Sequence, residues 1–253
     1  MRATIDLGSQ GVSYAAERGD VIVIIDALRA STTIACGLAA GAVRVIPALT
    51  VDEALELRRK PDHLVAGERG GIKVTGFDFG NSPTELLKHR DGLVGRSLIL
   101  TTSNGTRCAR AGLNGRATAI LAAGMPNATA AARTAARLAT EAGCNITLVA
   151  AGLDDAPNDE DLFTARLLLQ ILAVHYGAEC ATGEGELLDP EDSSRVFAHS
   201  EAGQRLGRLG YAPDVAFCAG LDTLDIVPIY RDGVGFVPAN GDTSVSVGES
   251  GNG

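Results

Sequence analysis

The chain is poor in aromatic residues and has no surplus of basic ones, and both shortages exclude classes of partner. Its 253 residues include no tryptophan and 4% aromatic residues, too few for a surface on which nucleic-acid bases stack. The formal net charge is −9, whereas a protein that binds duplex phosphates needs a basic footprint. We therefore expect no nucleic-acid partner.

Long apolar runs are also lacking, and we expect no secretory leader. No stretch of about 18 uninterrupted apolar residues predicts a membrane-spanning helix, and residues 1–6 have no apolar leader core. The five cysteines are scattered and none forms a CxxC pair, which predicts reduced thiols rather than a disulfide framework or a zinc site. We expect a cytoplasmic protein with no membrane partner.

Short apolar runs alternate with helical stretches along the chain. The β-branched run 21–25 is typical of a strand covered on both faces, and further strands are predicted at 43–46, 63–66, 97–100, 118–121, 145–151, 224–230 and 235–237. Helices are predicted at 31–40, 50–59, 83–89, 126–142, 162–176, 191–209 and 214–221, with a short one ending at 111. The alternation predicts an α/β fold with a mostly parallel or mixed sheet flanked by helices.

The same pattern predicts how the chain is divided. We expect one α/β unit over residues 1–238, with a candidate break between two lobes near 122–126. Residues 239–253 are rich in Gly, Ser and Asp and are expected to form a disordered tail.

Three polar loops follow predicted strands. They are 26–33 (DALRASTT), 67–83 (GERGGIKVTGFDFGNSP) and 101–107 (TTSNGTR). Ligands bind at the carboxyl ends of parallel strands, so we expect the loops to converge on one site. Because they combine glycine or hydroxyl residues with arginine in an otherwise acidic chain, they indicate a phosphate site.

Carboxylates in and near these loops are candidate metal ligands. Asp26 and Glu68 end predicted strands, and Mg²⁺ prefers oxygen ligands of this kind. Asp161 is a third candidate. Roles without a metal stay open for each: a turn or helix cap for Asp26, a local ion pair of Glu68 with Arg69, and a solvated loop for the acidic run around Asp161.

The loops also supply candidate catalytic and binding side chains. Arg29 and Arg69 are expected to act with Asp26 and Glu68, because guanidinium groups hold phosphoryl oxygens bidentately. The candidate substrate-binding residues are Ser31, Thr32, Thr33, Gly70, Gly71, Lys73, Asn81, Ser82, Thr101, Thr102, Asn104, Gly105 and Arg107.

Motifs of other phosphate chemistries are lacking, among them GxxxxGK[ST], GxGxxG and Cys-x5-Arg. We favour metal-assisted hydrolysis over a covalent Ser31 nucleophile, since no base adjoins Ser31 in the sequence.

Long motifs in these loops resemble the 2-phosphosulfolactate phosphatase family. They lie at 23–33, 67–71, 76–83 and 100–107, with 214–218 and 225–228 further on, in the family's order. The resemblance implies an α/β fold and Mg²⁺-dependent hydrolysis of (R)-2-phospho-3-sulfolactate to sulfolactate and phosphate, a step of coenzyme M biosynthesis. Departures at Phe79, at Ser103 and in the segment 153–157 bear on the substrate more than on the phosphate chemistry.

Alternative functions stay open at this point. The chain could be a phosphatase for another small phosphorylated hydroxy acid, a phosphotransferase or lyase, or a non-catalytic phosphometabolite-binding protein. The expected partner is in each case a small anionic phosphorylated molecule. A homo-oligomer is compatible with the sequence, which specifies no interface for one.

Overall fold

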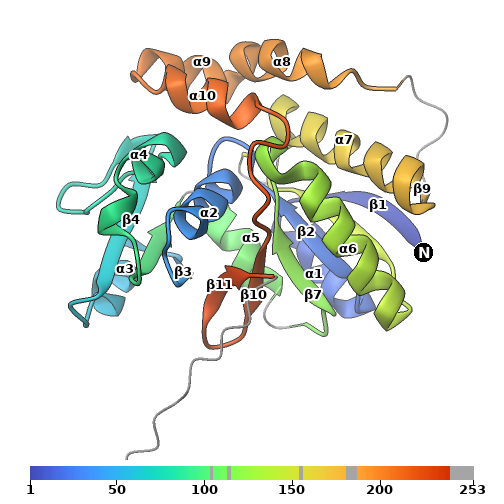
Figure 1. Ribbon diagram of the computed structural model, residues 1–253, viewed down its shortest axis with the longest axis horizontal. Helices are drawn as coiled ribbons and strands as arrows, with labels where there is room; N and C mark the ends of the chain where they lie inside the picture. The colour runs from blue at the N-terminus through green and yellow to red at the C-terminus, as the bar shows by residue number, and fades with distance from the viewer. Residues whose placement is uncertain (103–104, 113–114, 154–155, 181–186, 240–253) are drawn as a thin grey trace, which may run out of the picture.

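One mixed sheet organises the part of the chain that the computed structural model describes, residues 1–102, 105–112, 115–153, 156–180 and 187–239 (Figure 1). The strands run in the order β5-β4-β6-β3-β11-β10-β7-β2-β8-β1-β9. Their bounds are β1 (Arg2–Leu7), β2 (Val21–Ile25), β3 (Arg44–Ala48), β4 (His63–Arg69), β5 (Ile72–Lys73), β6 (Ser97–Thr101), β7 (Ala119–Ala122), β8 (Ile146–Ala150), β9 (Glu179–Cys180), β10 (Pro228–Arg231) and β11 (Gly235–Pro238).

Helices cover this sheet and one of its ends. They are α1 (Gly8–Arg18), α2 (Ala30–Ala39), α3 (Val51–Leu57), α4 (Pro83–Lys88), α5 (Gly105–Ala111), α6 (Ala128–Ala142), α7 (Asp159–Tyr176), α8 (Ser193–His199), α9 (Glu201–Arg208) and α10 (Ala212–Ala219), with short 3-10 turns η1 (Arg90–Gly92), η3 (Met125–Asn127) and η4 (Pro190–Asp192). Figure 1 shows α8, α9 and α10 lying across the top of the molecule, above both halves of the sheet.

Two groups of parallel strands make up the halves of the sheet. β3, β6 and β4 form one group, and β7, β2, β8, β1 and β9 form the other. The hairpin β10–β11 joins them by antiparallel pairs, Ile229 with Leu121 and Phe236 with Val45. The predicted fold class, α/β with a mixed sheet flanked by helices, is confirmed.

Strand β2, in the interior of the sheet, shows why apolar clusters form on both of its faces. All five of its residues are buried. Val21, Val23 and Ile25 pack into one apolar cluster with residues of α6 and α7, whereas Ile22 and Ile24 pack into a second cluster on the other face with residues of α1 and α2. Side chains alternate between the faces of a strand, so a continuous apolar run is what two covered faces require.

Several predicted boundaries agree with the structure for local reasons. Thr50 accepts a hydrogen bond from the Glu53 amide at the start of α3, and Ser82 does the same for Glu85 at the start of α4. Gly143 ends α6 with a left-handed backbone. The five cysteines are free thiols, as expected.

Other predictions need correction. The sequence did not predict β1 and α1, which precede residue 20, and β1 pairs in parallel register with β8. The segment 67–83 is not a continuous loop, since β4 extends to Arg69 and pairs with β5 in a short hairpin. The single helical stretch 191–209 breaks at Ser200, whose extended backbone and side chain cap α9.

Two further expectations concern the ends and the surface of the fold. Apart from Ala239, the predicted tail 239–253 lies outside the described residues. Within the described part of the chain, no helix is both long and apolar enough to cross a membrane.

Candidate active site

A small pocket forms where the three polar loops meet. Its volume is about 60 Å³, and it is lined by residues of the β2–α2 loop, the β4–β5 hairpin, the β5–α4 loop, the segments after β6 and β8, and α9. The predicted convergence of the loops is thus confirmed. The lining residues are Asp26, Leu28, Arg29, Glu68, Gly70, Gly71, Asn81, Thr102, Leu153, Arg205 and Leu206.

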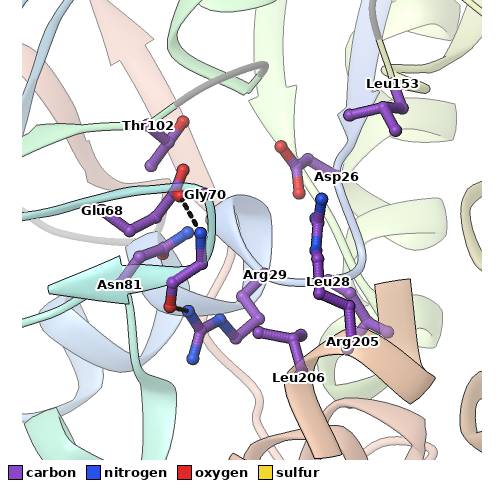
Figure 2. Close-up of a pocket in the computed structure, with 11 residues that line it drawn as sticks. Asp26, Leu28, Arg29, Glu68, Gly70, Asn81, Thr102, Leu153, Arg205 and Leu206 are labelled. Atoms are coloured by element: carbon purple, nitrogen blue, oxygen red, sulfur yellow. Dashed lines mark hydrogen bonds between the residues drawn. The ribbon is translucent and has the colours of Figure 1, made fainter. Parts of the chain in front are cut away.

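Two carboxylates face the pocket from opposite halves of the sheet. Asp26 and Glu68 are 8% and 6% exposed, and Figure 2 shows their carboxylates directed toward the space between them. The Ala30 amide donates to Oδ1 of Asp26 over 3.1 Å, and the Gly71 amide donates to Oε2 of Glu68 over 2.6 Å. These amides hold each carboxylate in place at its strand end, as metal- or water-binding groups require.

Gly71 shows why glycine follows Glu68 and Arg69. Its φ of +88° is left-handed, and a Cβ on it would lie 3.1 Å from the side chain of Leu209. Glycine alone takes this backbone without strain while allowing α9 to approach the hairpin so closely. This backbone conformation also directs the Gly71 amide toward the Glu68 carboxylate.

Arg29 is buried in a structural network at the edge of the pocket. Its guanidinium donates to Asp214 over 2.7 Å and to the Gly71 carbonyl over 3.0 Å, and it stacks over the Tyr211 ring. Asp214 also accepts from the Ser82 hydroxyl at 2.9 Å. The predicted catalytic Arg29 therefore lines the pocket but ties three segments together with its charge paired.

The hydroxyl residues at the start of α2 are buried beside the pocket and do not line it. The Ser31 hydroxyl donates to the Ile24 carbonyl and accepts from the Asp26 amide, both over 3.0 Å. Thr32 bonds the Ala27 carbonyl, and Thr33 is fully buried. These hydroxyls shape the loop that carries Asp26.

The other predicted residues divide in the same way. Arg69 donates to the Glu68 carbonyl and to the Thr101 hydroxyl, and Lys73 donates to the Asp78 carbonyl. Neither side chain lines the pocket. Arg107 is exposed on α5, the helix that begins at Gly105. Asn104 lies outside the described residues.

Asp161 is 1% exposed and does not line the pocket. Its two carboxylate oxygens accept from the Ala27 amide at 2.7 Å and the Gly152 amide at 3.0 Å. Burial, with the nearby charges of Asp26 and Glu160, raises the pKa of Asp161 well above its ordinary value. The carboxyl group thus joins the loops after β2 and β8.

Arg205 is a pocket residue that the sequence did not indicate. It comes from α9, far along the chain from the three loops, and Figure 2 shows its side chain directed toward Asp26. No glycine or hydroxyl motif surrounds it in the sequence, so nothing local distinguishes it from the other arginines of α8 and α9. Only the position of α9 across the sheet ends reveals it.

The donor set of the pocket fits a hard divalent cation. Asp26 and Glu68 supply carboxylate oxygens, and the buried side-chain oxygen of Asn81 has no hydrogen-bond partner among the described residues. Mg²⁺ commonly takes one or two carboxylates and completes its shell with water and phosphate oxygens. Within the described ranges, no three His, Cys, Asp or Glu side chains come together as a ready-made metal cluster.

Fold and pocket together define a class: an α/β protein with a polar, carboxylate-bearing pocket at the carboxyl ends of its strands. The family model described as 2-phosphosulpholactate phosphatase matches residues 10–233, and the chain belongs to this family.

Curated relatives agree with the family model over nearly the same span. A protein of Carboxydothermus hydrogenoformans is 38% identical over 82% of this chain and 84% of its own length. A Thermus thermophilus protein is 35% identical over 85% of this chain and 90% of its own, and one of Deinococcus radiodurans is 37% identical over 83% and 87%. Each of the three is called a probable 2-phosphosulfolactate phosphatase.

Proposed function

We propose that this chain is a magnesium-dependent phosphatase that hydrolyses (R)-2-phospho-3-sulfolactate to sulfolactate and phosphate. The observation that carries the proposal is the meeting of Asp26 and Glu68, from opposite halves of the sheet, in one pocket of a chain that belongs to the family. The names of the relatives support the substrate, and the oxygen donors of the pocket support the metal.

The residues of the pocket divide the chemistry between them. Asp26 and Glu68 would hold the ion, whose positive charge offsets charge on the phosphoryl oxygens. Asn81 and Thr102 line the pocket with groups that donate hydrogen bonds to those oxygens. Asp161 stays in a positioning role, because both its oxygens accept backbone amides.

Hydrolysis then needs a nucleophile and a protonated leaving group. One carboxylate of the Asp26–Glu68 pair orients the attacking water and accepts its proton. The water oxygen forms the new P–O bond as the ester P–O bond breaks, and the proton that the carboxylate took from the water passes to the leaving oxygen, which gives the hydroxyl group of sulfolactate.

The test is phosphate release by wild type and Asp26→Asn, with Mg²⁺ and with EDTA. The substitution keeps an oxygen for the Ala30 amide but removes the charge, so we expect kcat/KM to fall by on the order of 10²–10³-fold with the fold unchanged. EDTA should abolish release by the wild type. As a matched control, Glu56→Gln removes an exposed carboxylate of α3 and should leave the rate unchanged.

Substrate choice is measured in the same assay. Release from 2-phospho-3-sulfolactate well above that from phospholactate and phosphoglycerate supports the proposed substrate. Faster release from another of these acids keeps the phosphatase and changes its substrate. Binding without release from any of them contradicts the proposal and favours a phosphometabolite-binding protein.

A further inference from the structure

Arg205 stands between the pocket and a second, larger cavity. We call this second cavity, of about 230 Å³, the outer cavity, and the candidate active-site pocket, of about 60 Å³, the inner pocket. The two share the lining residues Asp26, Leu28, Leu153 and Arg205. A phosphoryl group suits the smaller space, and the rest of a phosphorylated acid must then extend past the shared wall. Arg205 is the basic residue on that wall.

We propose that Arg205 binds the sulfonate of the substrate and selects phosphate esters that carry this second anion. The inference rests on the proposed function, since it assumes that the phosphate occupies the inner pocket. In 2-phospho-3-sulfolactate the carboxylate and the phosphate ester are attached to the same carbon, C2, whereas the sulfonate is attached to the next carbon, C3. The sulfonate is therefore the group that reaches the shared wall.

Arg205 is the basic residue of the two cavities that is available to bind the sulfonate. Among the described residues that line either cavity, the basic ones are Arg29 and Arg205. Arg29 is 2% exposed and paired with Asp214. The Nε atom of Arg205, in contrast, is buried and has no hydrogen-bond partner among the described residues. A buried N–H without a partner costs free energy that a bound oxyanion recovers.

The outer cavity is otherwise unsuited to an anion. Asp159, Glu160 and Glu201 are among its lining residues. A sulfonate can accordingly be held only at the shared wall, where the planar guanidinium offers donors in a fork. The exposed carboxylates of Asp159 and Glu201 would repel a substrate whose second anion extended beyond Arg205 into this cavity.

The backbone of Arg205 is held in place although its Nε is unpartnered. The next residue, Leu206, is 2% exposed and packs close to Gly71 of the β4–β5 hairpin. At the start of α9, Gly203 packs against the Phe197 carbonyl so tightly that any Cβ there would collide with it. The guanidinium is thus presented by a fixed helix, as selective binding requires.

The experiment compares Arg205→Met with Arg208→Met on two substrates. Arg208 lies in the last turn of the same helix, is exposed and lines neither cavity. We expect Arg205→Met to lower kcat/KM for 2-phospho-3-sulfolactate by on the order of 10- to 150-fold, the value of hydrogen bonds to a charged group. The value for phospholactate, which lacks the sulfonate, should change less than about threefold, and Arg208→Met should match the wild type.

Sulfolactate binding, measured by calorimetry on the same proteins, separates this inference from the proposed function. Weaker binding to Arg205→Met than to Arg208→Met supports the inference, even if the wild type hydrolyses neither ester and the proposed function fails. Equal losses for both substrates, or no loss for either, would overturn it. So would unchanged sulfolactate binding.

Discussion

At the scale of single residues, the charge of Arg29 has a structural role. The pair with Asp214 is almost fully buried, with side chains 2% and 1% exposed. Arg29 belongs to the loop after β2 and Asp214 to α10. Arg29 also donates to the Gly71 carbonyl, and Asp214 accepts from the Ser82 hydroxyl, and both of these partners belong to the other half of the molecule. One ion pair therefore joins both halves and the helices above them.

Removing the Asp214 carboxylate should show how much the protein's stability depends on this ion pair. Asp214→Ala leaves Arg29 buried without its counter-charge, so we expect the free energy of unfolding to fall by about 3–5 kcal/mol, measured by urea denaturation. The double variant Arg29→Met/Asp214→Leu removes both charges and should recover much of that loss. A single variant as stable as the wild type would contradict the structural role.

The sequence predicted which loops form the site but not the task of each side chain. That Asp26 and Glu68 line the pocket was predictable, because each carboxylate stands at the end of an apolar run that forms a strand. Ser31 and Arg29 carry equally suggestive side chains, yet the fold turns them to the Ile24 carbonyl and to Asp214. Partners nearly 200 positions away, as Asp214 is from Arg29, leave no local signal.

At the scale of elements, α9 contains two glycines with opposite surroundings. A Cβ on Gly203 would collide with the Phe197 carbonyl, whereas a Cβ on Gly207 would meet nothing within 4 Å. Both lie in the same eight-residue helix. Gly207 therefore serves as a control for Gly203 in a test of how tightly α9 packs above the pocket.

Alanine at each position should give opposite results. We expect Gly203→Ala to destabilise the protein by about 1–3 kcal/mol by forcing α9 away from α8, and to lower phosphatase activity because Arg205 moves with the helix. Gly207→Ala should stabilise it by about 0.5–1 kcal/mol through helix propensity, with activity kept. Thermal unfolding and phosphate release measure both, and equal effects of the two changes would refute the close packing.

Elements with strong local signals were predicted well, and the failures have physical causes. The run 21–25 and the capped helix α3 carry their own signals of strand and helix. The β4–β5 hairpin was missed because its glycines indicate a loop, although two residue pairs suffice to continue the strand. The break at Ser200 was missed because helical residues lie on both sides of it.

At the scale of the whole molecule, the hairpin β10–β11 is what makes two groups of strands into one sheet. β10 pairs with β7 and β11 pairs with β3, and these elements come from the last part of the described chain. Phe236 is 1% exposed and packs into the cluster that Val45 shares. The join thus depends on buried apolar contacts as well as on backbone pairing.

Two truncations test this dependence. A chain that ends at Ile226 lacks the hairpin and leaves β3 and β7 with unpaired edges, so we expect it to lose cooperative thermal unfolding and to aggregate. A chain that ends at Ala239 keeps the hairpin. If the predicted tail 240–253 is disordered, this chain should unfold at the wild-type temperature, and a lower temperature would contradict that prediction.

The late position of the hairpin bears on how the protein is made. The ribosome synthesises β3 and β7 long before β10 and β11, at roughly 5–20 residues per second. The edges of β3 and β7 that pair with the hairpin therefore remain unpaired for several seconds. Arg205 and Asp214 also emerge late, after every loop that they contact. The nascent chain consequently has no complete pocket to bind a metabolite, and ligand cannot assist folding until α9 and α10 have been synthesised.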